Sequence, residues 1–132
     1  MDKIKRSNLV TQIYEAAREV HAFTGPGVIA SVYKSCLMHE LRLRSLRFRP
    51  NPCFSVNYKG LKIDDQINID LSIEEEVLIE IIAKPEDIPM HLIRLNTALA
   101  FSGYQLGILL DIHQSRLIDG FKKINNPKRN QS

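Results

Sequence analysis

The chain has 132 residues, of which 25% are charged and 44% hydrophobic, and its formal net charge is +3. Such a length suits one compact domain, and the near-average composition excludes a collagen-like or largely disordered protein. Two cysteines, Cys36 and Cys53, are too few for a disulfide framework or a cysteine-rich zinc site. Because no apolar run is long enough to cross a membrane and the first residues lack a secretion signal, a cytoplasmic protein without membrane contact is the default expectation.

Charge is distributed unevenly along the chain. The net charge is +5 over residues 1–50, −6 over residues 51–93 and +4 over residues 94–132. An acidic middle between basic ends suits a cation site beside a polyanion. It equally suits helices with solvated basic faces packed around an acidic hairpin. The charge pattern alone leaves both interpretations open.

Apolar residues at helical spacing predict three helices. The first runs from about Asn8 to Phe23 and stops at a Gly-Pro-Gly sequence, and the second runs from about Ile29 to Arg44. The third begins near Pro89 and stops at Gly103.

Strands are predicted between and after these helices. Alternating or apolar segments predict them at Phe54–Tyr58, Leu61–Asp65, Ile67–Leu71, Val77–Ala83, Tyr104–Ile112 and Leu117–Ile124. Glu74, Glu75 and Glu76 predict an exposed turn. The expected fold class is α/β: one domain over residues 1–124 with a mixed sheet of four or five strands flanked by helices, then a polar, flexible tail over residues 125–132.

Two acidic residues stand out within this pattern. Glu80 lies inside the most apolar strand, where a charge is costly without a partner, and Asp70 lies between apolar neighbours before it. If the two segments form a hairpin around Glu75, the residues lie opposite each other on one face. Carboxylates at that spacing suit Mg²⁺. Pairing with arginines of the flanking helices is the alternative.

The sequence resembles the GxxExxY proteins, small bacterial domains of the PD-(D/E)XK nuclease-like superfamily, over about residues 8–124. The resemblance rests on short fragments in a fixed order: Glu19-Val20-His21, Gly25-Pro26-Gly27, Gly27 to Tyr33, Tyr58-Lys59-Gly60, Asp70-Leu71, Leu78-Ile79-Glu80, Pro89-Met90-His91, Gly107 to Leu110 and Asp119-Gly120. It implies a Mg²⁺-dependent phosphodiester hydrolase site, in which an aspartate and a glutamate hold the metal and a lysine two residues beyond the glutamate acts on the attacking water. A glutamate from the first helical region and a glutamine from the helix after the strand complete the site that the resemblance implies.

Only the two carboxylates of that site are kept in this sequence. Asp70 and Glu80 match the metal positions, whereas the lysine position is Ile82, the helix glutamate position is Ala30 and the glutamine position is Arg94. The resemblance therefore implies an altered site that lacks the groups for efficient hydrolysis.

Other residues near this site have open roles. Lys84 lies on the same strand face as Glu80 and is a candidate relocated lysine, although Pro85 indicates that the strand ends there. Arg94 is expected to neutralise Asp70 or Glu80 rather than act as a base. His91 is expected to cap or pack its helix rather than bind a metal, and Tyr33 is expected in the core with its hydroxyl toward the site.

These observations favour an inactive nuclease-like protein that binds DNA, RNA or a protein partner. The basic residues expected to contact nucleic acid are Arg42, Arg44, Arg47, Arg49, Lys122 and Lys123. The alternative is an active Mg²⁺-dependent nuclease that uses Lys84. A third possibility is a structural or homo-oligomeric module that has no ligand.

Overall fold

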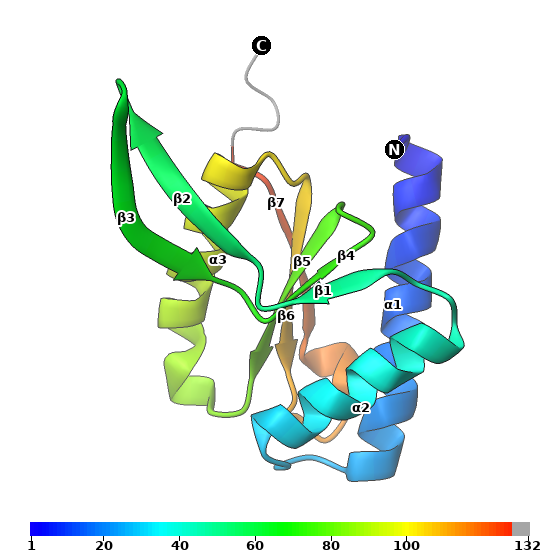
Figure 1. Ribbon diagram of the computed structural model, residues 1–132. Coiled ribbons are helices and arrows are strands. Elements are labelled where there is room, and N and C mark those ends of the chain that lie inside the picture. Colours follow the sequence, from blue (N-terminus) through cyan, green and yellow to red (C-terminus); the bar gives the residue numbers. More distant parts are fainter. Residues whose placement is uncertain (128–132) are drawn as a thin grey trace.

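The computed structural model describes residues 1–127, apart from the side chains of residues 64–66, and a five-stranded sheet separates two layers within it (Figure 1). Helices α1 and α2 cover one face, and α3 and a two-stranded hairpin lie on the other. The elements are α1 Lys3–Thr24, α2 Ala30–Leu43, β1 Phe48–Pro50, β2 Cys53–Tyr58, β3 Leu61–Asn68, β4 Leu71–Ile73, β5 Val77–Ile82, η1 Pro85–Asp87, α3 Ile88–Ser102, β6 Leu106–Asp111, η2 Leu117–Asp119 and β7 Phe121–Asn125. The α/β fold class with a mixed sheet is confirmed.

The large sheet has the strand order β1-β4-β5-β6-β7. Strands β5 and β6 are parallel, and α3 connects them, whereas the other neighbours are antiparallel. A parallel pair requires such a crossover, which places α3 against the sheet face. Strands β2 and β3 form a separate hairpin, which projects from the sheet beside α3 (Figure 1).

Strand β5 divides the hydrophobic core into two parts, because its side chains alternate between the faces. Val77, Ile79 and Ile81 belong to the cluster formed with α1 and α2, whereas Leu78 and Ile82 belong to the cluster formed with α3. All six residues of β5 are buried. Glu80 is therefore a carboxylate in the row of side chains that faces α3.

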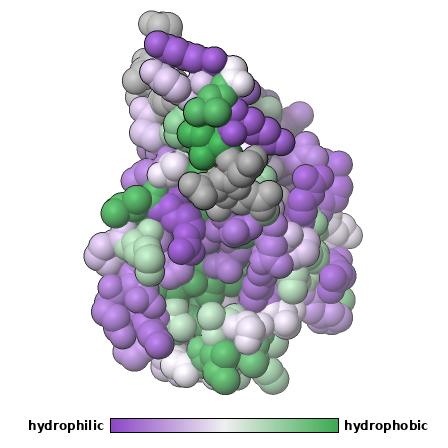
Figure 2. All heavy atoms as spheres, turned by 60° about the vertical axis from the view of Figure 1, so that its left-hand side comes forward, coloured by the Kyte–Doolittle hydropathy of each residue, from purple (hydrophilic) through white to green (hydrophobic). Residues whose placement is uncertain are grey.

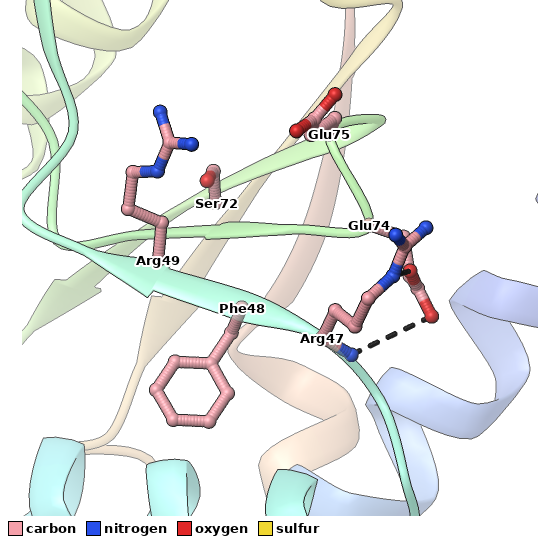
Figure 3. A pocket seen from close by; sticks show the side chains of 6 residues that line it. All are labelled: Arg47, Phe48, Arg49, Ser72, Glu74 and Glu75. Carbon is pink, nitrogen blue, oxygen red and sulfur yellow. Dashed lines mark hydrogen bonds and ion pairs between the residues drawn. The ribbon is translucent and has the colours of Figure 1, made fainter.

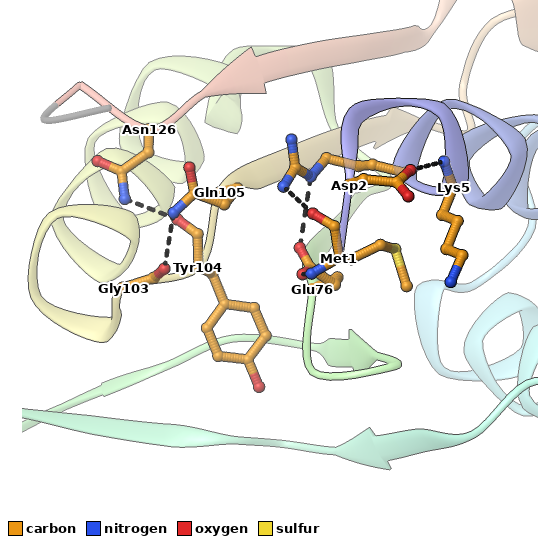
Figure 4. Close-up of polar contacts among 9 residues, drawn as sticks. Met1, Asp2, Lys5, Glu76, Gly103, Tyr104, Gln105 and Asn126 are labelled. Atoms are coloured by element: carbon orange, nitrogen blue, oxygen red, sulfur yellow. Dashed lines mark hydrogen bonds and ion pairs between the residues drawn. The ribbon is translucent and has the colours of Figure 1, made fainter. Parts of the chain in front are cut away.

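Helix α1 begins earlier than predicted, at Lys3 rather than near Asn8, because residues before the apolar stripe supply its cap. The carboxylate of Asp2 accepts the backbone N–H of Lys5 at 2.8 Å (Figure 4). Arg6 and the terminal amine both approach Glu76 at 3.4 Å, which ties this end of α1 to the turn before β5.

Helices α1 and α2 are joined by Tyr33. Its ring is fully buried, and its hydroxyl donates to the backbone oxygen of Ala17 at 2.9 Å. The prediction that this hydroxyl points toward the candidate site is therefore wrong, since it is bound to α1. Burial raises the pKa of the Tyr33 phenol. In residues 1–127 no helix is long and apolar enough to cross a membrane.

The C-terminal strand extends to Asn125, and the next residue still belongs to the packed structure. Asn126 is buried, and its amide donates to the backbone oxygen of Leu99 at 2.8 Å. The same amide donates to the backbone oxygen of Tyr104 at 2.6 Å (Figure 4). Of the predicted polar tail, residues 128–132 lie outside the described part of the chain.

Three features of the strands differ from the prediction. Of the predicted strand Leu117–Ile124, residues Leu117–Asp119 form the 3-10 helix η2, and the strand β7 begins only at Phe121. Residues 61–68 form one continuous strand, and the chain breaks at Ile69 and Asp70 before β4, so the predicted strand Ile67–Leu71 spans that break. Short strand β1, at the edge of the large sheet, was not predicted. Three residues are too few to give a periodic signal.

Candidate functional site

Asp70 and Glu80 meet where β4 and β5 lie side by side. The register pairs Leu71 with Ile79 and Ile73 with Val77, so one further step brings Asp70 opposite Glu80. The Asp70 N–H donates to Glu80 Oε1 at 3.1 Å, and the N–H of Ile81 donates to Asp70 Oδ2 at 2.7 Å. Each acid is thus held by the backbone of the opposite segment.

The two carboxylates differ in burial. Glu80 is 1% exposed and lies between Leu78 and Ile82 on the face that packs against α3, whereas Asp70 is half-buried. Burial raises the pKa of Glu80 and the negative charge of Asp70 raises it further, although the hydrogen bond from His91 opposes these effects. The site therefore holds one carboxylate whose ionised form is disfavoured by its surroundings.

Helix α3 supplies two partners for Glu80. His91 and Arg94 are three residues apart and share the helix face that turns toward the sheet. His91 Nδ1 lies 2.6 Å from Glu80 Oε2, where the carboxylate accepts the ring N–H, and Arg94 Nη1 lies 3.6 Å from the same oxygen. The prediction that His91 caps or packs its helix is wrong, because its ring binds the buried carboxylate.

Helix α2 supplies a cation that the sequence analysis missed. Lys34 Nζ lies 3.9 Å from Asp70 Oδ1 and also donates to the side-chain oxygen of Asn51. Ala30, which matches a family site position, is one helical turn before Lys34 on the same side of α2. That spacing is the signal that would have placed Lys34 near the acids.

A pocket of about 380 Å³ lies beside the acids, and two of the three altered family positions, Ala30 and Arg94, line it. Ala30, Lys84 and Arg94 line this pocket together with Asp70 and Glu80. Lys84 is exposed, as expected for a residue just beyond the strand end.

The position two residues beyond Glu80 has a different environment. Ile82 is 1% exposed and packs with Leu95 and Leu99 of α3 in the second core cluster. The isoleucine side chain has no titratable group and is shielded from water. The structure therefore offers no proton-carrying group at the position where the resemblance implies a lysine.

The acids do not form a ready site for a divalent cation. All four of their oxygens already face a protein donor or cation: Lys34 and the Ile81 N–H at Asp70, and the Asp70 N–H, His91 and Arg94 at Glu80. Among residues 1–127, no group of three or more His, Cys, Asp or Glu side chains is placed to hold a metal ion. The donor set present here fits internal ion pairing better than Mg²⁺.

Ion pairs join the acidic middle of the chain to its basic ends. Within the described residues, these pairs are Met1 and Arg6 with Glu76, Lys34 with Asp70, Arg47 with Glu74, and Arg94 with Glu80. The uneven charge distribution therefore reflects, in part, acids of the sheet that are neutralised by the surrounding elements.

The predicted basic cluster at the end of α2 is largely engaged by its own neighbours. Arg42 lies over the ring of Phe48, and Arg44 pairs with Glu19 at 2.7 Å and Glu40 at 2.8 Å. Those two acids raise the pKa of the Arg44 guanidinium.

Arg47 and Arg49 line a second, smaller pocket of about 170 Å³ with Ser72 (Figure 3). Arg47 is bound to Glu74 at 2.8 Å, and that carboxylate raises the pKa of Arg47. The side chain of Arg49 lies beside Ser72 and away from Glu74 (Figure 3). Arg49 is thus the cation of this pocket that is most available to a ligand.

The remaining basic residues lie elsewhere. Lys122 and Lys123 are exposed on β7, at the edge of the sheet opposite β1. The structure does not bring them together with Arg47 and Arg49. On the face formed by α3 and the hairpin, polar residues predominate across the middle and apolar residues form smaller groups above and below (Figure 2).

The sequence model of the PD-(D/E)XK nuclease superfamily matches residues 7–124 of the chain. The match spans most of the chain, and the observed sheet with its acid pair fits that assignment. The protein belongs to the PD-(D/E)XK nuclease superfamily. No curated protein and no solved structure gives a significant match to the chain.

The burial of Glu80 predicts a pH-dependent effect of the Glu80→Gln substitution. Because the folded state raises the pKa of Glu80 above its ordinary value of 4.5, this group stabilises the fold fully only at low pH, and that contribution is lost as the pH rises through the folded-state pKa. Glu80→Gln should therefore gain stability relative to the wild type as the pH rises above about 4.5. Urea unfolding of both proteins at each pH measures the difference, and a difference that shrinks with pH contradicts the prediction.

Proposed function

We propose that this chain is a GxxExxY-type member of the PD-(D/E)XK nuclease superfamily that does not hydrolyse phosphodiesters efficiently and acts by binding. The observation that carries the proposal is Ile82, which is buried against α3 at the position where an active site of this kind needs a lysine. An isoleucine cannot orient or deprotonate a water molecule. Ala30 lines the pocket beside the acids, and its side chain supplies no carboxylate at the position where the resemblance implies a glutamate.

Nucleic acid is the partner that the remaining chemistry favours. Lys84 and Arg94 line the pocket beside the acid pair, and Arg49 is exposed in the second pocket, beside Ser72 of β4. A phosphate backbone that lies across this polar face would meet those cations without needing a cleaved bond. Binding of a protein or a second copy of the chain is the alternative that the same experiments distinguish.

A cleavage assay tests the inactive part of the proposal. Purified protein should cleave duplex DNA, single-stranded DNA and RNA no faster than Asp70→Ala or Glu80→Ala protein, with either Mg²⁺ or Mn²⁺ present. Metal-dependent cleavage by the wild type that both substitutions abolish would falsify the proposal. A contaminating nuclease would instead persist in both variants.

A second candidate function has one observation in its favour. Lys34 lies 3.9 Å from Asp70, and Lys84 lines the pocket beside the two acids. An amine is therefore near the acids, although no lysine follows Glu80 within strand β5. A Mg²⁺-dependent nuclease with a relocated lysine would lose its cleavage on Lys84→Gln or Lys34→Gln. The cleavage assay decides between the two candidates, because only this one predicts a wild-type activity to lose.

Nucleic-acid binding should be sensitive to salt and to charge reversal near the site. If two phosphates are contacted, raising the salt concentration fourfold weakens binding about tenfold, because condensed counterions are released on association. The double variant Arg49→Glu/Lys84→Glu should weaken binding by a similar factor. Lys122→Glu/Lys123→Glu makes the same change in charge at the opposite sheet edge and serves as the control. Fluorescence anisotropy of a labelled oligonucleotide measures both, and affinity that ignores salt and both variants points to a protein partner.

A further inference from the structure

We infer that Lys34 and Arg94 together take the place of a divalent cation beside Asp70 and Glu80, and that removing them uncovers a metal-binding site. The first support is charge. Two ionised carboxylates carry a charge of −2, and one lysine with one arginine neutralises them as one divalent ion would. Each cation faces a different acid: Lys34 approaches Asp70 at 3.9 Å, and Arg94 approaches Glu80 at 3.6 Å.

The second support is position. The two cations come from different layers of the fold, Lys34 from α2 and Arg94 from α3, and reach the acids from separate directions. Lys34 is held further by Asn51, and it is only 17% exposed. A lysine placed in this way is part of the packed structure around the site and not a mobile surface group.

The third support is that two of the four carboxylate oxygens accept no backbone N–H group from the described part of the chain. Asp70 Oδ2 and Glu80 Oε1 accept backbone N–H groups, which fix both carboxylates in place. The other two oxygens are Asp70 Oδ1, which faces Lys34, and Glu80 Oε2, which faces Arg94 and His91. Glu80 Oε2 keeps its 2.6 Å hydrogen bond from His91 and has a second lone pair for a metal. Mg²⁺ and Mn²⁺ bind through one or two carboxylates and keep several waters, so Asp70 Oδ1 and this lone pair would suffice once Lys34 and Arg94 are gone.

The test measures the effect of Mn²⁺ on thermal unfolding of the full chain. About 5 mM MnCl₂ should leave the wild-type Tm within about 1 °C, whereas it should raise the Tm of Lys34→Gln/Arg94→Gln by about 3 °C or more, because a ligand that binds only the folded state stabilises it. Adding Asp70→Asn to that double variant should remove the response. Lys122→Gln/Lys123→Gln, with the same loss of charge on β7, should respond as the wild type does.

Two outcomes would overturn the inference: a wild-type Tm that rises with Mn²⁺ as much as that of the double variant, or a folded double variant that does not respond. If the double variant fails to fold, Lys34→Met/Arg94→Met, which removes both charges but keeps apolar side chains of similar length, takes its place, and titration calorimetry with Mn²⁺ replaces the Tm as the readout. That variant should bind Mn²⁺ where the wild type does not, and a folded variant without binding counts as the second outcome. The inference deepens the proposed function and rests on it, but its readout is metal binding. Wild-type cleavage would end the proposed function, whereas a missing Mn²⁺ response in the variant would end only this inference.

Discussion

Replacing His91 with leucine is expected to lower the free energy of unfolding by about 3 kcal/mol at neutral pH. The reason is the carboxylate that would remain. Glu80 is 1% exposed, and its shortest side-chain contact is the 2.6 Å hydrogen bond to His91. Without the ring, Arg94 at 3.6 Å is the only cation near that oxygen among the described residues, and it is partly exposed. Urea unfolding at neutral pH measures the loss.

The matched controls separate charge from packing. In a Glu80→Gln background the same His91→Leu change should cost less than about 1 kcal/mol, since no buried charge is left without its partner. His39→Leu, on the exposed side of α2, should stay within about 0.5 kcal/mol of the wild type. If His91→Leu costs equally in both backgrounds, the ring contributes by packing and the proposed role of its hydrogen bond is wrong.

The acid pair could be predicted from sequence because hairpin register is a local property. Side chains alternate along each strand, and Glu74 to Glu76 mark the turn, so counting outward from that turn predicts the pair. In the structure Leu71 pairs with Ile79, and one further step along this register brings Asp70 opposite Glu80. The apolar run of β5 also made Glu80 conspicuous, since a charge inside a buried strand requires a partner.

The partners of the acids were harder to predict because they come from helices. The period of a helix indicates which side is buried, but not the sheet residues over which each turn lies. Arg94 was expected near the acids only because the resemblance assigns its position to the site. The resemblance assigns no such position to Lys34. His91 lies in the first turn of α3, where the sequence alone predicts only capping or packing. The strands of the β2–β3 hairpin were predicted, but not that they form a sheet of their own, because alternation identifies strands and not the sheet to which they belong.

The basic residues illustrate the same limit. Arg42 to Arg49 form a dense cluster in sequence, yet Arg44 and Arg47 are paired with acids contributed by α1, α2 and the turn before β5. Whether a charge is available to a ligand depends on these long-range neighbours. Counting cations along the chain therefore overestimates the surface available for nucleic acid.

The largest expected change in activity comes from returning two missing groups to the site. Ile82→Lys places an amine on the same strand face as Glu80, because residues two apart share a face. Ala30→Glu places a carboxylate on the pocket wall that Asp70 and Glu80 also line. Because Lys34 and Arg94 are inferred to take the place of the metal, these two substitutions are added to Lys34→Gln/Arg94→Gln. The quadruple variant should cleave DNA or RNA with Mn²⁺ at least about 100-fold faster than the Lys34→Gln/Arg94→Gln protein, which is the low end of what acid–base groups contribute.

The packing around position 82 makes a measurement of folding part of this experiment. Ile82 belongs to the same buried cluster as Leu95 and Leu99, so a lysine stem at this position would lie along apolar side chains while its amine turns toward Glu80. We expect a destabilisation of about 2 kcal/mol from the lost packing, which urea unfolding would detect. Adding Glu80→Gln to the quadruple variant should abolish the cleavage without lowering stability further, since it removes a buried charge. A folded quadruple variant that binds Mn²⁺ but does not cleave would mean that the missing lysine and glutamate are not what keeps the protein inactive.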